Sequence, residues 1–61
     1  DVARGRQEFA KFLKRNGYSK AGDLYQQAAD GYTALRAGQS DIYSMEAIAA
    51  LEKQGLNELY K

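Results

Sequence analysis

Large hydrophobic residues recur at helical spacing in three segments of this 61-residue chain, and glycines separate the segments. In residues 2–15, the large apolar side chains fall within one narrow arc of a helical wheel, and most charged side chains fall opposite. The members of this arc are Val2, Phe9, Phe12 and Leu13. The pattern predicts an amphipathic first helix over residues 2–15 whose apolar stripe lies in a core.

The second segment, residues 20–37, carries a stripe of Ala, Leu and Tyr that stays in phase through Gly31. We therefore expect one continuous helix, although an internal Gly weakens a helix relative to Ala. The stripe consists of Ala21, Leu24, Tyr25, Ala28, Tyr32 and Leu35.

The third segment, residues 41–54, has a wide apolar arc that also contains Glu52. A wide arc fits a helix wedged between two others, and it equally fits a helix with one face left for a partner. We expect Glu52 to reach solvent because the helix bends or ends near Gly55.

Glycines and serines mark the expected helix boundaries. Gly17, Gly38 and Gly55 each follow a basic residue by two positions at the end of a periodic segment, where Gly can adopt the left-handed conformation that closes a helix. Ser19 and Ser40 stand where the next N-caps are needed, because a hydroxyl can accept a hydrogen bond from a first-turn N–H.

Together these signals predict helices over residues 2–15, 20–37 and 41–54, with a short turn over 56–60. Asp23 with Gln26 is a rival start for the second helix, in the spacing of a capping box. The predicted fold class is all-α, a small three-helix bundle formed by a single domain over residues 1–61.

The composition favours helices but allows only a small core. There is no Pro, and ten of the 27 apolar residues are Ala, so the larger core volume must come from eleven Leu, Ile, Val and Phe together with Met45 and five Tyr. A domain of this size hides only about 60% of the surface that its unfolded chain exposes, so oligomerisation or docking would add stability. The chain begins with Asp, and we expect it to be processed or excised from a longer protein.

The missing residue types argue against catalysis. Without His or Cys, the chain has no imidazole base, no thiolate nucleophile and no usual zinc ligand apart from carboxylates. Glu46 and Glu52 are six residues apart and fall on different sides of a helix, and Asp23 and Asp30 lie two turns apart. We expect no enzyme activity, no cofactor and no bound metal.

The five tyrosines are the most distinctive feature. They either replace the missing aliphatic residues in the core or form a protein interface, where Tyr is enriched. Combined with the wide arc of the third helix, the second interpretation gives a candidate protein-binding edge on the second and third helices. Its residues are Tyr25, Tyr32, Tyr43, Met45 and Glu52.

The charge is unevenly distributed. Residues 1–20 carry a net charge of +4 and residues 21–61 a net charge of −3. Either the two parts complement each other within one domain, or the first helix meets an acidic partner or nucleic acid. The candidate nucleic-acid-binding residues are Arg4, Arg6, Lys11, Lys14 and Arg15. No helix-turn-helix pattern supports them, because the third helix is net acidic.

The leading hypothesis is therefore a non-catalytic helical module that binds another protein, the rest of a parent chain or a second copy of itself. A small nucleic-acid-binding domain that uses the basic first helix is the alternative, and a purely structural domain of a larger protein is the second alternative. We expect no membrane partner, because no segment is long enough to span a bilayer and the core needs the stripe of the first helix.

Overall fold

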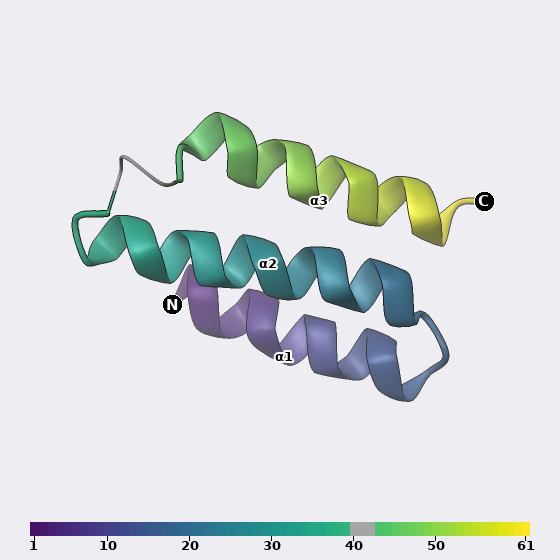
Figure 1. The fold of residues 1–61 in the computed structure, drawn as a ribbon. Coiled ribbons are helices and arrows are strands. Elements are labelled where there is room, and N and C mark those ends of the chain that lie inside the picture. Colours follow the sequence, from purple (N-terminus) through teal and green to yellow (C-terminus); the bar gives the residue numbers. More distant parts are fainter. Residues whose placement is uncertain (40–42) are drawn as a thin grey trace.

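The computed structural model describes residues 1–39 and 43–61, which form three α-helices. Helix α1 spans Val2–Arg15, α2 spans Ser19–Arg36 and α3 spans Met45–Leu59. Helix α2 runs antiparallel to both of its neighbours, so α1 and α3 point in the same direction (Figure 1). The fold is a small three-helix bundle, as the hydrophobic pattern predicts.

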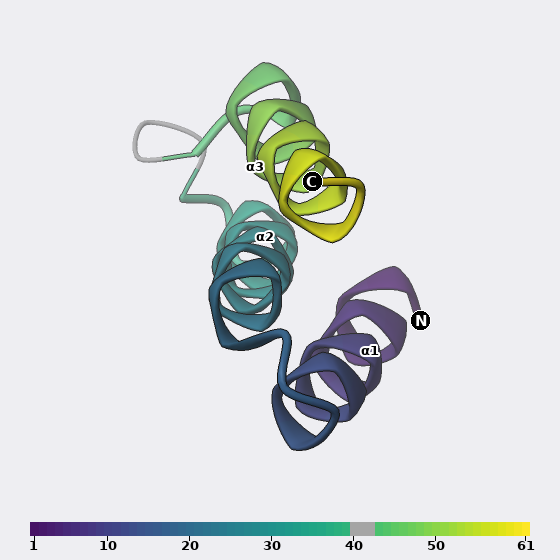
Figure 2. The same ribbon diagram turned by 90° about the vertical axis from the view of Figure 1, so that its right-hand side faces the viewer.

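Helix α2 is the centre of the bundle. It packs against α1 on one side and against α3 on the other, and no Cα atom of α1 lies within 8 Å of one in α3. Viewed along the helices, the three form an arc with α2 in the middle (Figure 2). The two outer helices are thus joined to each other by side chains alone.

Two glycines end helices as predicted. After α1, Gly17 has φ 88°, and the Tyr18 N–H donates to the Leu13 carbonyl at 2.8 Å. After α2, Gly38 has φ 82°, and the Gln39 N–H donates to the Ala34 carbonyl at 2.9 Å. Both are Schellman motifs, in which a left-handed residue lets the chain turn back and satisfy a carbonyl of the last helical turn.

The predicted bounds of the third helix are wrong at both ends. The helix starts at Met45 instead of residue 41, because the Ser44 hydroxyl accepts a hydrogen bond from the Ala47 N–H at 3.1 Å and caps it there. It runs to Leu59, so residues 56–60 do not form a separate turn.

The structure tests one of the two serines predicted to be N-caps. Ser19 is the first residue of α2 and not its cap, since Tyr18 occupies the cap position without a side-chain hydrogen bond. The rival start at Asp23 is excluded, because α2 already includes that residue. Ser40 lies outside the described residues.

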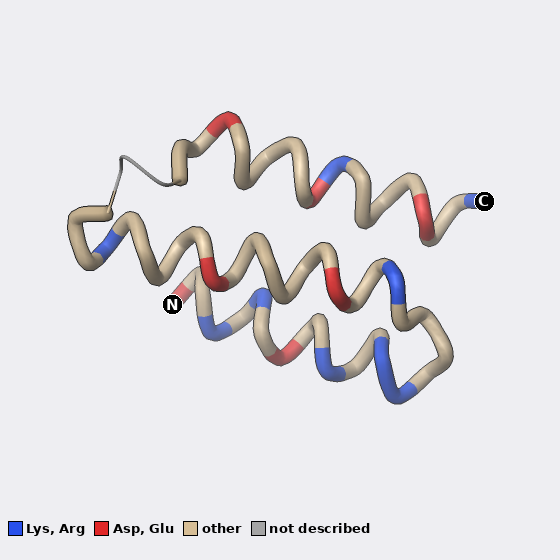
Figure 3. The backbone as a smooth tube through the Cα atoms, in the orientation of Figure 1, with Lys and Arg blue, Asp and Glu red and all other residues tan. Residues whose placement is uncertain are grey.

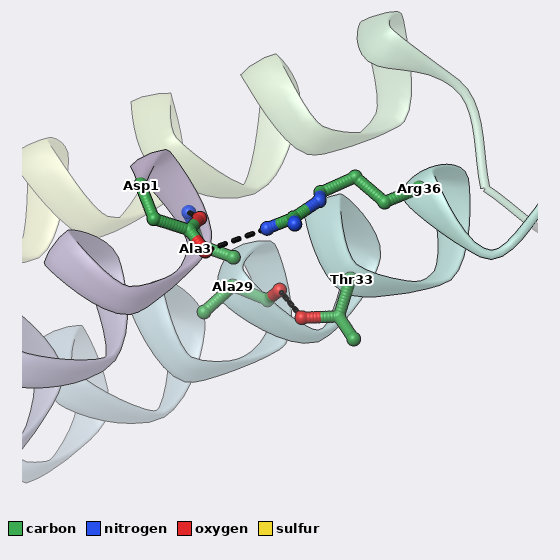
Figure 4. Close-up of polar contacts among 5 residues, drawn as sticks. All are labelled: Asp1, Ala3, Ala29, Thr33 and Arg36. Carbon is green, nitrogen blue, oxygen red and sulfur yellow. Dashed lines mark hydrogen bonds and ion pairs between the residues drawn. The ribbon is translucent and has the colours of Figure 1, made fainter.

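The N-terminus is held against the end of α2. One Asp1 carboxylate oxygen accepts a hydrogen bond from the Ala3 N–H at 3.0 Å and caps α1, and the other contacts the Arg36 guanidinium at 2.6 Å (Figure 4). Within α2, the Thr33 hydroxyl donates to the Ala29 carbonyl at 3.1 Å. Asp1 therefore joins the first turn of α1 to the last turn of α2.

The core consists mainly of alanine. The buried hydrophobic residues are Ala3, Ala10, Leu13, Ala21, Tyr25, Ala28, Ala29, Ala34 and Ile48. Only Leu13, Tyr25 and Ile48 among them have large side chains. The helices therefore approach closely but bury little apolar area for each residue, in agreement with the small core expected from composition.

Candidate partner-binding face

Tyr25, a predicted protein-binding residue, belongs to the core. Its side chain is 5% exposed, and its ring meets the Phe9 ring edge-to-face with centroids 4.9 Å apart. On the other side it faces Gly55 of α3, where a Cβ atom would lie 2.7 Å from the Tyr25 Cε2 atom. Tyr25 thus connects all three helices from the inside and is not available to a partner in this conformation.

The sequence pattern predicts that Glu52 reaches solvent, but in the structure its side chain lies against the other two helices. The Tyr32 hydroxyl donates a hydrogen bond to Glu52 Oε1 at 3.0 Å, and Arg6 Nε lies 3.4 Å from Glu52 Oε2. The Glu52 side chain is only 21% exposed. The expectation was wrong because α3 continues through Gly55 and keeps Glu52 directed at the other two helices.

This polar cluster of Arg6, Tyr32 and Glu52 has one residue on each helix. Burial, and then the hydrogen bond to Glu52, raise the pKa of the Tyr32 hydroxyl above its ordinary value of 10.0. Arg6 Nε is buried and makes no hydrogen bond within the described residues, so its contact with Glu52 is an ion pair without a hydrogen bond. The cluster links α1 to α3 across the central helix.

The remaining predicted protein-binding residues do not form one surface. Tyr43 precedes α3 and is partly buried, with its Cδ1 atom 3.0 Å from where a Cβ atom of Gly31 would lie. Met45 is 57% exposed at the start of α3. Of the five residues proposed for the binding edge, Met45 alone is strongly exposed, whereas Tyr32, Tyr43 and Glu52 are half-buried and Tyr25 is buried.

A different set of exposed apolar residues surrounds the Arg6–Glu52 pair. Val2 and Phe9 lie four residues before and three residues after Arg6, which places them on the same side of α1. On α3, Met45 lies seven residues before Glu52 and Leu56 lies four residues after it, which places both on the same side of α3 as Glu52. Because Arg6 and Glu52 point toward each other, the two sets lie on the same side of the bundle. Phe12 stacks on Phe9 and extends this set along α1. We call this set the apolar face; its exposed members are Val2, Phe9, Phe12, Met45 and Leu56.

The two phenylalanines are the most distinctive part of the apolar face. Phe9 and Phe12 stack with their ring planes 12° apart and centroids 6.3 Å apart, and Phe12 is 52% exposed. The sequence pattern placed both in the core. That prediction fails for Phe12 and also for Phe9 and Val2, which are 38% and 53% exposed, because α3 does not lie beside α1 and nothing in the described residues covers the outer half of the stripe. The sequence contained one signal of this exposure, because a stripe of large residues on α1 does not match the Ala-rich stripe of α2.

The five basic residues proposed for nucleic-acid binding all lie on α1 (Figure 3). Two of them pair with other helices: Arg6 with Glu52, and Lys14 with Asp23 at 3.2 Å. Lys11 pairs with Glu8 at 3.7 Å on the exposed surface of α1. Arg4 and Arg15 have no carboxylate of the described residues within 4.0 Å. The predicted cationic patch is thus partly neutralised by the fold.

The described residues contain neither a metal-binding cluster nor a membrane span. Within residues 1–39 and 43–61, no three acidic side chains are grouped so that they could hold a metal ion. No helix of these residues has the length and apolar character needed to cross a membrane. No protein-family model, curated protein or solved structure matches this chain.

Proposed function

We propose that this domain is a non-catalytic protein–protein interaction module that binds its partner through the apolar face. The observation that carries the proposal is the exposure of five large apolar side chains that helix spacing and the Phe9–Phe12 stack place on one side of α1 and α3. Contiguous exposed apolar surface rimmed by polar residues is typical of interaction sites, and aromatic residues and Met are enriched at the centre of interfaces.

The small core supports the same proposal. Most buried side chains are Ala, and several larger apolar residues remain partly exposed to water. Burial of apolar area therefore stabilises the isolated domain only a little. A partner seated on the apolar face would remove Phe9, Phe12 and Leu56 from water and add the burial that the isolated bundle lacks. The absence of His and Cys from the sequence supports the non-catalytic part of the proposal.

The test compares two variants with similar exposure. Phe12→Ser removes an aromatic residue of the apolar face, and Tyr18→Ser removes an aromatic residue that is 49% exposed outside it. Each is used as bait in an extract of the producing cells, and every captured protein is purified and titrated against the domain. We expect Tyr18→Ser to bind its partner as the natural sequence does, and Phe12→Ser to bind at least about tenfold more weakly.

Three outcomes would count against the proposal. One is a purified partner that binds both variants equally. Another is capture of nucleic acid that depends on Arg4 and Arg15 and is lost on adding salt, which would favour the nucleic-acid alternative. A third is binding to lipid vesicles that Phe12→Ser abolishes, which would make the apolar face a membrane-contact surface.

A further inference from the structure

Asn16 and Gly17 lie in the connection between α1 and α2 and form a reactive pair. The chain has two Asn residues, Asn16 and Asn57, and only Asn16 is followed by Gly. The carbonyl carbon of an Asn side chain is an electrophile that the backbone nitrogen of the next residue can reach. Gly favours the reaction between them because it has no side chain to shield its nitrogen. Asn16 is therefore the Asn of this chain whose side-chain amide is most open to chemical modification.

The structure leaves the Asn16–Gly17 bond accessible to water. Both residues are exposed, and a Cβ atom at Gly17 would meet none of the described residues within 4 Å. The Gly17 N–H donates to the Lys14 carbonyl at 3.3 Å, whereas the next N–H, that of Tyr18, donates to the Leu13 carbonyl at 2.8 Å. The nucleophilic nitrogen is thus held by the longer and weaker of these two hydrogen bonds.

The Asn16 side chain is held away from this nitrogen while the end of α1 is closed. Its Nδ2 atom donates to the Phe12 carbonyl at 2.7 Å, one turn back along the helix. Attack by the Gly17 nitrogen therefore requires that the last turn of α1 opens and that the Asn16 side chain turns forward. Helix ends of native proteins open at a free-energy cost far below that of global unfolding, so the folded domain reaches this state.

We propose that Asn16 is a site of spontaneous deamidation. In the open helix end, the Gly17 nitrogen loses its proton to hydroxide and forms a bond to Asn16 Cγ. The bond from Cγ to Nδ2 then breaks, and the leaving nitrogen takes a proton from water and departs as ammonia. Water opens the resulting cyclic imide. Opening at Cγ gives Asp, and opening at the backbone carbonyl gives isoaspartate, in which the main chain runs through Cγ.

Both products weaken the end of α1. Each replaces the amide by a carboxylate, so the hydrogen bond to the Phe12 carbonyl is lost and a negative charge lies at a helix C-terminus, where it is unfavourable. Isoaspartate also lengthens the backbone between Leu13 and Tyr18, whose hydrogen bond closes the Schellman motif. Deamidation therefore loosens the connection between α1 and α2.

The test incubates the whole 61-residue chain in mildly alkaline buffer and follows both Asn residues by mass spectrometry of proteolytic peptides. Deamidation exchanges NH for O, and labelling by an isoaspartate methyltransferase detects the isoaspartate. We expect Asn16 to be converted at least about tenfold faster than Asn57, because Glu58 shields the nitrogen after Asn57 and α3 must open around it.

Two substitutions separate the reaction from its consequence. Asn16→Gln keeps an amide but would have to form a larger ring, so its mass and its melting temperature should stay constant during the incubation. The melting temperature of the natural sequence should fall as isoaspartate accumulates. Freshly purified Asn16→Asp has the charge without the altered backbone, so its melting temperature should lie between those of the unmodified and isoaspartate forms.

A synthetic peptide of residues 12–20 provides the unfolded reference. We expect it to react faster than the folded chain, because its Asn16 is not held by a helix. An intact Asn16 in the folded chain, after an incubation that converts the peptide, would overturn the proposal, and so would equal rates at Asn16 and Asn57. Conversion to isoaspartate without a fall in melting temperature would disprove the loosening of the connection.

Discussion

The hydrogen side chain of Gly55 allows the Tyr25 ring to lie directly against the backbone of α3. Tyr25 is the largest buried side chain of the domain, and its ring also supports Phe9 of α1. A single small residue therefore determines how closely the third helix can approach the other two. The sequence pattern instead placed a helix end at this position.

Replacing Gly55 by Ala is expected to destabilise the domain. The new methyl group would lie 2.7 Å from the Tyr25 ring, and overpacking of this kind costs about 1–3 kcal/mol, against a gain of about 1 kcal/mol in helix propensity. Gly5→Ala has the same propensity gain without a neighbour, so it should stabilise by about 0.5–1 kcal/mol. Urea unfolding of both variants measures the difference, and equal stabilisation of the two would disprove the close contact.

At the residue scale, the sequence could not reveal which apolar side chains are buried. Tyr25 and Tyr32 are seven residues apart on the same helix face, yet one is buried in the core and the other binds Glu52 at its edge. Phe12 fits the stripe of α1 as well as Leu13 does, but only Leu13 is buried. Helical periodicity gives the direction of a side chain, and its burial depends on what the neighbouring helices place opposite it.

Among the elements, all three helices were predictable, and the bounds of α1 and α2 were close to the observed ones, whereas those of α3 were wrong at both ends. For the first two helices the apolar stripe and a capping glycine agree on the same end, and Gly17 and Gly38 do adopt positive φ. For α3, the residues around Gly55 have the same local appearance as those around Gly17, but the reason for the glycine is Tyr25, thirty positions away in the sequence. Local signals cannot distinguish a capping glycine from one that allows close packing.

The start of α3 offers a prediction at this scale. Ser44→Ala removes the hydroxyl that accepts from the Ala47 N–H, and loss of such a cap costs about 1 kcal/mol. Ser19→Ala is the natural control, because Ser19 lies inside the first turn of α2 and caps nothing. Its effect should stay within about 0.5 kcal/mol in the same denaturation experiment. A larger loss for Ser19→Ala than for Ser44→Ala would contradict the observed helix starts.

For the whole molecule, ionisation should limit stability at both ends of the pH scale. Burial raises the pKa of Tyr25 and of Tyr32 above 10.0, and Glu52 contributes to both shifts. A raised pKa means that the protonated form is favoured by folding, so this stabilisation is present below pH 10.0 and is lost as the pH rises further. A hydrogen bond from Lys61 lowers the pKa of Glu58 below 4.5, so its contribution is present above that pH and is lost in more acidic solution.

Unfolding free energies measured from acidic to strongly alkaline pH check this expectation. Tyr32→Phe removes the hydrogen bond to Glu52, which should cost about 1 kcal/mol at neutral pH, and it should reduce the loss of stability above pH 10.0. Tyr60→Phe, in a side chain that is 85% exposed, should leave neutral stability unchanged. An alkaline limb that is identical with and without the Tyr32 hydroxyl would show that Tyr32 does not contribute to it.

The separation of α1 from α3 also has a consequence for how the chain folds. Close backbone contacts join only α1 with α2 and α2 with α3, which are neighbours along the sequence, and the Arg6–Glu52 pair links α1 to α3 through side chains alone. Contact order is therefore low, and no long loop must close before the native contacts begin to stabilise the chain. Helical domains with this property fold in microseconds to milliseconds. The α1–α2 pair has its own close contacts, so α3 can dock onto α2 after that pair has formed.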